Sequence, residues 1–85
     1  MNARALVARN IRRIRVSRGL SQEALAVDAE IDRTYVSRLE RNLENPTVAV
    51  LERISTVLNC RVTDLFAMSG VGKVGTLKPG RKRRG

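Results

Sequence analysis

The sequence contains no histidine, no tryptophan and a single cysteine. Without a second cysteine no disulfide can form within the chain, and without histidine neither a zinc cluster nor a histidine-based catalytic site can be built. The glycines of GVGKVG are not framed by a strand and a helix, so they do not predict a nucleotide-binding loop. These absences remove most enzyme classes, and we expect neither an enzyme nor a bound cofactor. Cys60 lies where a helical bundle buries an apolar residue, which favours a small core hydrophobe over the alternative of a reactive thiol.

Aromatic residues and long apolar runs are also scarce. Tyr35 and Phe66 are the only aromatic residues, so the core must be aliphatic, and the spacing of Leu, Ile, Val and Ala predicts an all-α fold. No run of 18 apolar residues exists, and MNARALVARNIRRIR lacks the apolar segment of a secretory signal. We therefore predict a cytoplasmic protein. A helix over residues 3–18 could also lie on a membrane surface, but its arginines are better explained as the solvent face of a core helix.

The length of 85 residues allows one domain with a modest core. After Met68 the composition changes to SGVGKVGTLKPGRKRRG, which holds five of the six glycines and has no regular apolar pattern. Such a segment cannot bury enough apolar surface to fold. The chain is therefore predicted to contain a domain over residues 1–68, followed by a flexible basic tail over residues 69–85.

The formal net charge is +9, from 17 Lys and Arg against 8 Asp and Glu. Residues 73–85 hold six of the basic groups and no acid, which leaves 11 against 8, or +3, for residues 1–72. This distribution favours a polyanionic partner, most often nucleic acid, over a soluble protein that is merely basic. The GRKRRG end has the same two interpretations: it binds phosphates without sequence preference, or it only raises solubility.

Apolar spacing and capping residues predict a series of short helices. They are expected over residues 3–18, 22–28, 33–41 and 48–58, with one or two further turns over residues 62–67. Gly19 can end the first helix in the left-handed conformation, and Ser21, Asp32 and Thr47 are suitable N-caps for the next three. The inward face of the fourth helix is predicted to comprise Val48, Leu51, Ile54, Ser55 and Leu58.

The helix over residues 33–41 has a polar, cationic outer face. On a 3.6-residue wheel the inward residues are Val36, Leu39, Glu40 and Leu43, the opposite residues are Thr34, Ser37, Arg38 and Arg41, and Arg33 and Tyr35 lie on the flanks. In the major groove of DNA, arginine can bind a guanine edge with two hydrogen bonds, and serine or threonine can meet donors or acceptors. The pattern therefore predicts a helix that reads bases.

At these residues the chain resembles the phage-repressor and Cro type of helix-turn-helix DNA-binding proteins, the XRE-like transcriptional regulators. The matching positions are Arg15, GLSQE at residues 19–23, Leu25, Ala26, IDRTYVS at residues 31–37, LER at residues 39–41, Asn45, Pro46, Leu51, Leu58, Leu65 and Phe66. The run DRTYVSRLERN is most similar to small controller proteins that time the expression of restriction-modification genes. The resemblance implies a five-helix bundle of the lambda-repressor-like DNA-binding type.

The function implied by the resemblance is sequence-specific binding of double-stranded DNA by a transcriptional regulator that inserts the helix at residues 32–41 into the major groove of an operator. The implied base contacts are Arg33, Thr34, Ser37 and Arg38, and the implied backbone contacts are Gln22, Tyr35, Arg41, Asn45 and Thr47. Without the resemblance, Gln22 would be an ordinary exposed residue of a first helical turn. Members of the family often dimerise through the last helix, so a homodimer is expected, with its reading helices about 34 Å apart.

The resemblance also implies a structural ion pair between Arg15 and Glu40, since a carboxylate on the inward side of a helix is costly to bury alone. The sequence departs from the family at two places. Glu30 replaces a glycine that the family usually holds in the left-handed conformation, at a cost of about 1 kcal/mol. Arg61 replaces the serine that usually caps the last helix. Asn42 and Asn59 also stand where glycine is common, but asparagine tolerates that conformation.

A protein-interaction module, such as an antitoxin-like domain, is the alternative function. It would bind a partner protein with little dependence on salt and would prefer no particular duplex. The outward face with Arg33 and Arg38 argues against it, because protein interfaces favour an apolar centre. Antitoxins can bind both DNA and protein, so the two interpretations are compatible.

Overall fold

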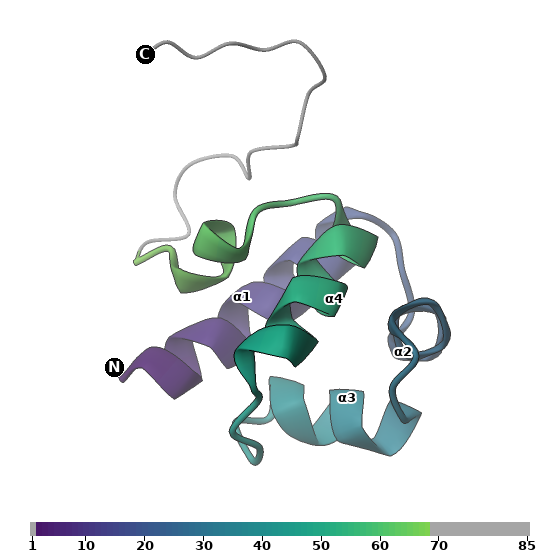
Figure 1. The fold of residues 1–85 in the computed structure, drawn as a ribbon, viewed down its shortest axis with the longest axis horizontal. Coiled ribbons are helices and arrows are strands. Elements are labelled where there is room, and N and C mark those ends of the chain that lie inside the picture. Colours follow the sequence, from purple (N-terminus) through teal and green to yellow (C-terminus); the bar gives the residue numbers. More distant parts are fainter. Residues whose placement is uncertain (1, 69–85) are drawn as a thin grey trace, which may run out of the picture.

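The computed structural model describes residues 2–68 as a small helical bundle (Figure 1). The elements in order are α1 (Ala3–Ser17), α2 (Gln22–Ala29), α3 (Arg33–Glu40), α4 (Val48–Leu58) and the 3-10 helix η1 (Val62–Phe66). The all-α prediction is confirmed, and the predicted five-helix bundle is slightly off: the described residues form four α-helices, and the short element predicted over residues 62–67 is a 3-10 helix. None of these described helices combines the length and apolarity needed to cross a membrane. The predicted tail lies outside the described residues.

Each α-helix begins at a polar side chain that accepts a hydrogen bond from the first turn. The acceptors are Asn2 for the N–H of Ala5 at 2.8 Å, Ser21 for Ala24 at 2.9 Å, Asp32 for Thr34 at 2.8 Å and Thr47 for Val50 at 3.1 Å. These bonds satisfy N–H groups that have no partner inside the helix, which fixes where the helix starts. The N-caps predicted at Ser21, Asp32 and Thr47 are confirmed.

The α-helices end at, or just before, a residue in the left-handed conformation. These residues are Gly19 (φ 73°), Glu30 (φ 59°), Asn42 (φ 63°) and Asn59 (φ 56°), as the sequence predicted. Glycine and asparagine adopt this conformation readily, but the Cβ of glutamate is crowded there. Arg53 of α4 compensates at Glu30, because its Nε donates to the carbonyl of Ala29 at 3.0 Å and its Nη2 to that of Glu30 at 3.2 Å. The end of α2 is thereby tied to α4.

The left-handed conformation of Glu30 gives a testable stability effect. We expect Glu30→Gly to raise the free energy of unfolding by about 0.5–1 kcal/mol, since relief of the Cβ crowding exceeds the extra entropy that glycine gives the unfolded chain. Urea denaturation measures the change. Glu30→Ala is the matched control, because it removes the carboxylate but keeps the Cβ, and it should give no such gain. Equal effects of the two substitutions would contradict this explanation.

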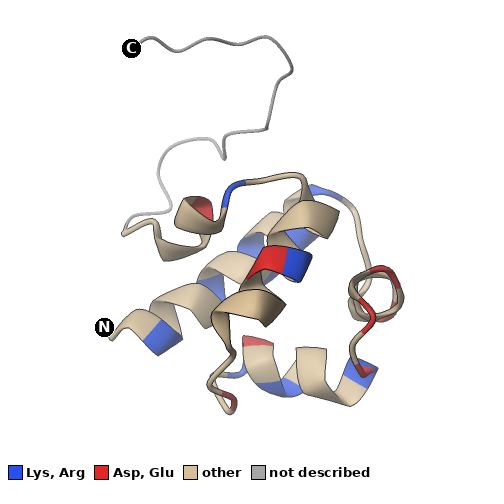
Figure 2. Ribbon diagram, in the orientation of Figure 1, with Lys and Arg blue, Asp and Glu red and all other residues tan. Residues whose placement is uncertain are grey.

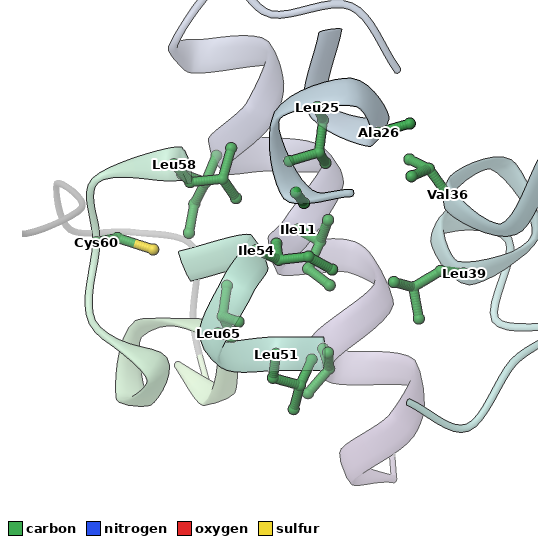
Figure 3. Packing of buried hydrophobic residues seen from close by; sticks show 13 residues of the cluster. Ile11, Leu25, Ala26, Val36, Leu39, Leu51, Ile54, Leu58, Cys60 and Leu65 are labelled. Carbon is green, nitrogen blue, oxygen red and sulfur yellow. The ribbon is translucent and has the colours of Figure 1, made fainter. Parts of the chain in front are cut away.

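The core is aliphatic and draws on every element (Figure 3). Its buried members are Val7, Ile11, Ile14, Leu25, Ala26, Ala29, Val36, Leu39, Leu51, Ile54, Leu58, Cys60 and Leu65. Cys60 is 2% exposed, as expected of a small core hydrophobe. Burial, and then the carboxylate of Asp64, raise the pKa of this thiol to about 11, so it stays protonated at neutral pH.

Two apolar residues predicted to face inward are instead exposed. Leu43 is 48% exposed because α3 ends at Glu40 and the left-handed Asn42 turns the chain outward before the next position of the wheel. Val48 is 68% exposed at the first position of α4. The remaining inward residues of α4 are buried, including Ser55, whose hydroxyl donates to the carbonyl of Glu52 at 2.9 Å.

Polar contacts attach η1 to the bundle. The fully buried Asn10 of α1 donates from Nδ2 to the carbonyls of Leu65 at 2.9 Å and Ala67 at 3.0 Å. At the start of η1 the backbone N–H of Arg61 donates to Oδ2 of Asp64 at 2.9 Å, and the N–H of Asp64 donates to the carbonyl of Arg61 at 2.9 Å, so the backbone supplies the acceptor that a serine side chain would have provided. These contacts join polar side chains to backbone groups, so the spacing of apolar residues could not predict them.

Candidate nucleic-acid interface

The outer face of α3 is open to solvent, while its inner face packs on the core. Val36 and Leu39 are buried. Of the four residues predicted to contact bases, Arg33, Thr34 and Arg38 are exposed and Ser37 is half-buried. The structure therefore brings these side chains together on a surface of α3 that a DNA groove could reach.

Arg38 is held in place by groups that follow α3. Its Nε donates to Oε2 of Glu44 at 2.7 Å, and its Nη2 donates to the carbonyl of Leu43 at 3.1 Å. Both side chains of this ion pair are partly exposed, 45% for Arg38 and 29% for Glu44. These bonds use one side of the guanidinium and leave the edge formed by Nη1 and Nη2, which is the edge that can bind guanine. Glu44 could not be predicted as a partner of Arg38 from helical spacing, because it lies beyond the end of α3.

A buried ion pair joins α1 to α3. Arg15 donates from Nε to Oε2 of Glu40 at 2.6 Å and from Nη2 to Oε1 at 3.0 Å. Its Nη1 also donates to the carbonyl of Leu20 at 2.7 Å. The side chains of Arg15 and Glu40 are 10% and 2% exposed. This two-bond geometry offsets part of the cost of burying both charges, and it is the pair that the resemblance implied.

Gln22 is connected to that ion pair. Its Nε2 donates to Oε1 of Glu40 at 3.1 Å, and the residue is half-buried rather than freely exposed. Gln22 is also the first residue of α2, where backbone N–H groups without helical partners and the helix dipole favour an anion. The second hydrogen on Nε2 is available to such an anion. The contact with Glu40 thus fixes the direction in which the Gln22 amide points.

Three further residues predicted to contact the DNA backbone lie at the end of α3 and in the loop that leads to α4. Arg41 is exposed, and its Nε donates to the carbonyl of Ser37 at a long 3.3 Å. Asn45 is exposed. Thr47 uses its hydroxyl oxygen to cap α4, which leaves the hydroxyl hydrogen free to donate. All three can offer hydrogen-bond donors to phosphates.

Tyr35 differs from the other predicted backbone contacts because its ring packs against the core cluster. Burial, and then the carboxylate of Glu44, raise the pKa of its phenol above the ordinary value. The hydroxyl therefore remains a hydrogen-bond donor at neutral pH. Tyr35 is partly a structural residue, and only its polar end can serve an interface.

The charged residues are unevenly distributed over the fold. Figure 2 shows basic segments along α1 and α3, whereas α2 and the turn after it carry acidic ones. The acidic residues of that region are Glu23, Asp28, Glu30 and Asp32. From sequence, the basic residues of α1 were expected to form a solvent face and to place some positive charge near a bound backbone, and the fold places several of them beside the end of α3.

The chain is similar to members of a helix-turn-helix family. A family model described as helix-turn-helix, HTH_3, matches residues 11–65. The chain is 36% identical over 72 residues to the control protein C.BamHI of Bacillus amyloliquefaciens, covering 84% of this chain and 89% of that protein. It is 44% identical over 63 residues to a hypothetical transcription factor of Neisseria meningitidis, covering 74% of this chain and 59% of that protein.

A solved structure is similar over most of the bundle. The protein C.Esp1396I, a restriction-modification controller protein, has been solved bound to a 25 base pair operator site. Its chain in that complex gives a TM-score of 0.70 and 36% identity, covering 78% of this chain and 87% of that chain.

Proposed function

The chain belongs to the helix-turn-helix family HTH_3, and from this premise we propose that it is a sequence-specific regulator of transcription that inserts residues 32–41 into the major groove of an operator. The observation that carries the proposal is the exposed polar face of α3 in a fold similar to that of an operator-bound controller protein. Two relatives are control proteins, so a promoter of restriction-modification genes is the first place to seek its operator.

Sequence is read by side chains of α3. Arg33 and Arg38 each bind a guanine edge through two hydrogen bonds, and Thr34 and Ser37 contact neighbouring bases. Arg38 is already held by Glu44 and the carbonyl of Leu43, so less side-chain entropy is lost when it binds. Each good arginine–guanine pair provides about 1–3 kcal/mol of discrimination against a wrong base.

Backbone contacts position α3 on the duplex without reading sequence. These come from Gln22, Tyr35, Arg41, Asn45 and Thr47. No bond is made or broken, so the protein acts by occupying its site rather than as an enzyme. It is proposed to function as a cytoplasmic homodimer, as the resemblance to the family implies, and two copies with their α3 helices about 34 Å apart would meet successive turns of the duplex.

The proposal is tested by selecting duplexes from a random pool and titrating them with the full chain at several salt concentrations. We expect one preferred, inverted-repeat sequence that binds about 10³-fold or more tightly than random DNA. Sedimentation with the selected duplex should show two chains per site. Equal affinity for every duplex, together with salt-insensitive binding to a protein partner, would instead support the protein-interaction alternative.

A further inference from the structure

A groove of about 540 Å³ runs between α1 and the end of α3. Its polar lining comprises Arg9, Arg12 and Arg13 of α1, and Glu40, Arg41 and Asn42 at the end of α3; we refer to it as the α1 groove. Small apolar side chains of α1, including Ala5 and Ala8, complete the lining. None of the three α1 arginines was singled out as a binding residue from the sequence.

The α1 groove has a strong positive charge. Four arginines line it, and Glu40 is its single acidic lining residue among those described. Glu40 cannot compensate them, because its side chain is 2% exposed and both of its oxygens accept hydrogen bonds from Arg15. A concave surface with this charge concentrates anions, and a bound anion would relieve the repulsion among the guanidinium groups.

The arginines of the groove retain unused hydrogen-bonding capacity. Within the described residues the buried Nε of Arg13 has no acceptor, although its Nη2 donates to Oδ1 of Asn10 at 3.2 Å. Arg9 makes a weak contact, from Nη2 to the carbonyl of Met68 at 3.4 Å. Structural arginines elsewhere in the fold are bound more tightly, as Arg18 is to the carbonyl of Leu58 at 2.7 Å. Arg9 and Arg12 are exposed, so their guanidinium groups can donate to a ligand in the groove, whereas the buried Nε of Arg13 lies out of its reach.

The α1 groove is continuous with the candidate DNA surface. Glu40 lines the groove and also accepts the hydrogen bond from Gln22, and Arg41 belongs to both surfaces. Arg9 and Arg12 are about 4.5 Å apart along the helix axis, and one strand of the duplex carries a phosphate about every 3.4 Å of its axis, so the two arginines can serve neighbouring phosphates. A DNA strand that passes Gln22 and Arg41 can thus continue along α1.

We propose that the α1 groove binds backbone phosphates of the duplex outside the base pairs that α3 reads, so that α1 lengthens the operator footprint. This inference rests on the proposed function, and it assigns Arg9 and Arg12 to positioning rather than to sequence recognition. The continuity with Gln22 and Arg41 favours phosphates over the other anionic partner that such a groove could accept, an acidic segment of a protein.

The test compares the wild type with the double variant Arg9→Gln/Arg12→Gln on two duplexes, one ending at the selected site and one extended by random sequence. Arg61→Gln is the control, because it removes an exposed arginine outside the groove. On the extended duplex we expect the double variant to reduce the slope of log K against log salt by about 1.8, or about 0.9 for each lost contact. The preference for selected over random sequence should not change, and Arg61→Gln should keep the wild-type slope.

If the double variant kept the wild-type slope of log K against log salt on the extended duplex, the inference would be overturned. If poly-glutamate bound the wild type and not the double variant while the DNA slope stayed the same, the groove would be assigned to an acidic protein instead. Failure of the proposed function is distinguishable: a wild type with no preferred duplex would overturn operator reading, while the salt slopes on random DNA would still decide the role of the groove. Circular dichroism would verify that each variant is folded.

Discussion

Replacing Glu40 by alanine is expected to lower the free energy of unfolding by about 3–5 kcal/mol, because Arg15 would remain buried without its counter-ion. The substitution removes both hydrogen bonds from Arg15 and the one from Gln22. A domain of this size has only about 5–10 kcal/mol of stability, so the variant should be partly unfolded at modest urea concentrations. Urea titration followed by circular dichroism measures the loss.

Two further variants separate the ion pair from the general effect of removing a glutamate. Glu52→Ala removes an exposed carboxylate from α4 and should change stability by less than about 0.5 kcal/mol. The double variant Arg15→Met/Glu40→Leu leaves no unpaired charge, so it should regain most of what either single substitution loses. If Glu40→Ala lowered the free energy of unfolding by less than about 1 kcal/mol, the buried pair would contribute no more to stability than an ion pair at the protein surface does.

Arg38→Ala is expected to weaken binding to the selected duplex by about 1–3 kcal/mol, roughly 5- to 150-fold, and to relax specificity at one base pair. The physical reason is loss of an exposed guanidinium whose Nη1/Nη2 edge is left for a base by its bonds to Glu44 and Leu43. Titration against the selected duplex and its single-base variants measures both effects. Arg41→Ala is the comparison, since loss of a phosphate contact should weaken all sequences alike. If Arg38→Ala changed neither affinity nor the selected sequence, the assignment of the reading helix would be wrong.

Helix limits could be predicted from the sequence because their signals are local. Ser21, Asp32 and Thr47 each act within one helical turn, and the left-handed residues act on the turn just before them. The wrong predictions concern positions whose burial or contacts depend on the path of the chain after a helix ends, which the local sequence pattern does not determine. Apolar spacing continues in the sequence past the end of α3, so Leu43 was wrongly placed inside. The short element over residues 62–67 was predicted, but its attachment by Asn10, more than fifty residues away, was not.

The candidate site was predictable only as far as one helix face. Alternation of apolar and polar residues placed Arg33, Thr34 and Arg38 on the outside of α3 without reference to any other element. The contact of Arg38 with Glu44 could not be predicted, because it depends on the path of the loop after α3. The α1 groove could not be predicted without knowing that α1 packs beside the end of α3. In the sequence of α1 alone, its arginines look like those of any solvent-exposed helix face.

The chain of contacts from Arg15 through Glu40 to Gln22 has a consequence for genetics. A screen for lost regulation would recover substitutions at Glu40 alongside those of true operator contacts, although this carboxylate is nearly inaccessible to solvent. Suppressor mutations would tell the two groups apart. Substitutions that stabilise the bundle at remote positions should rescue a Glu40 mutant in part, and should not rescue a mutant of Arg33.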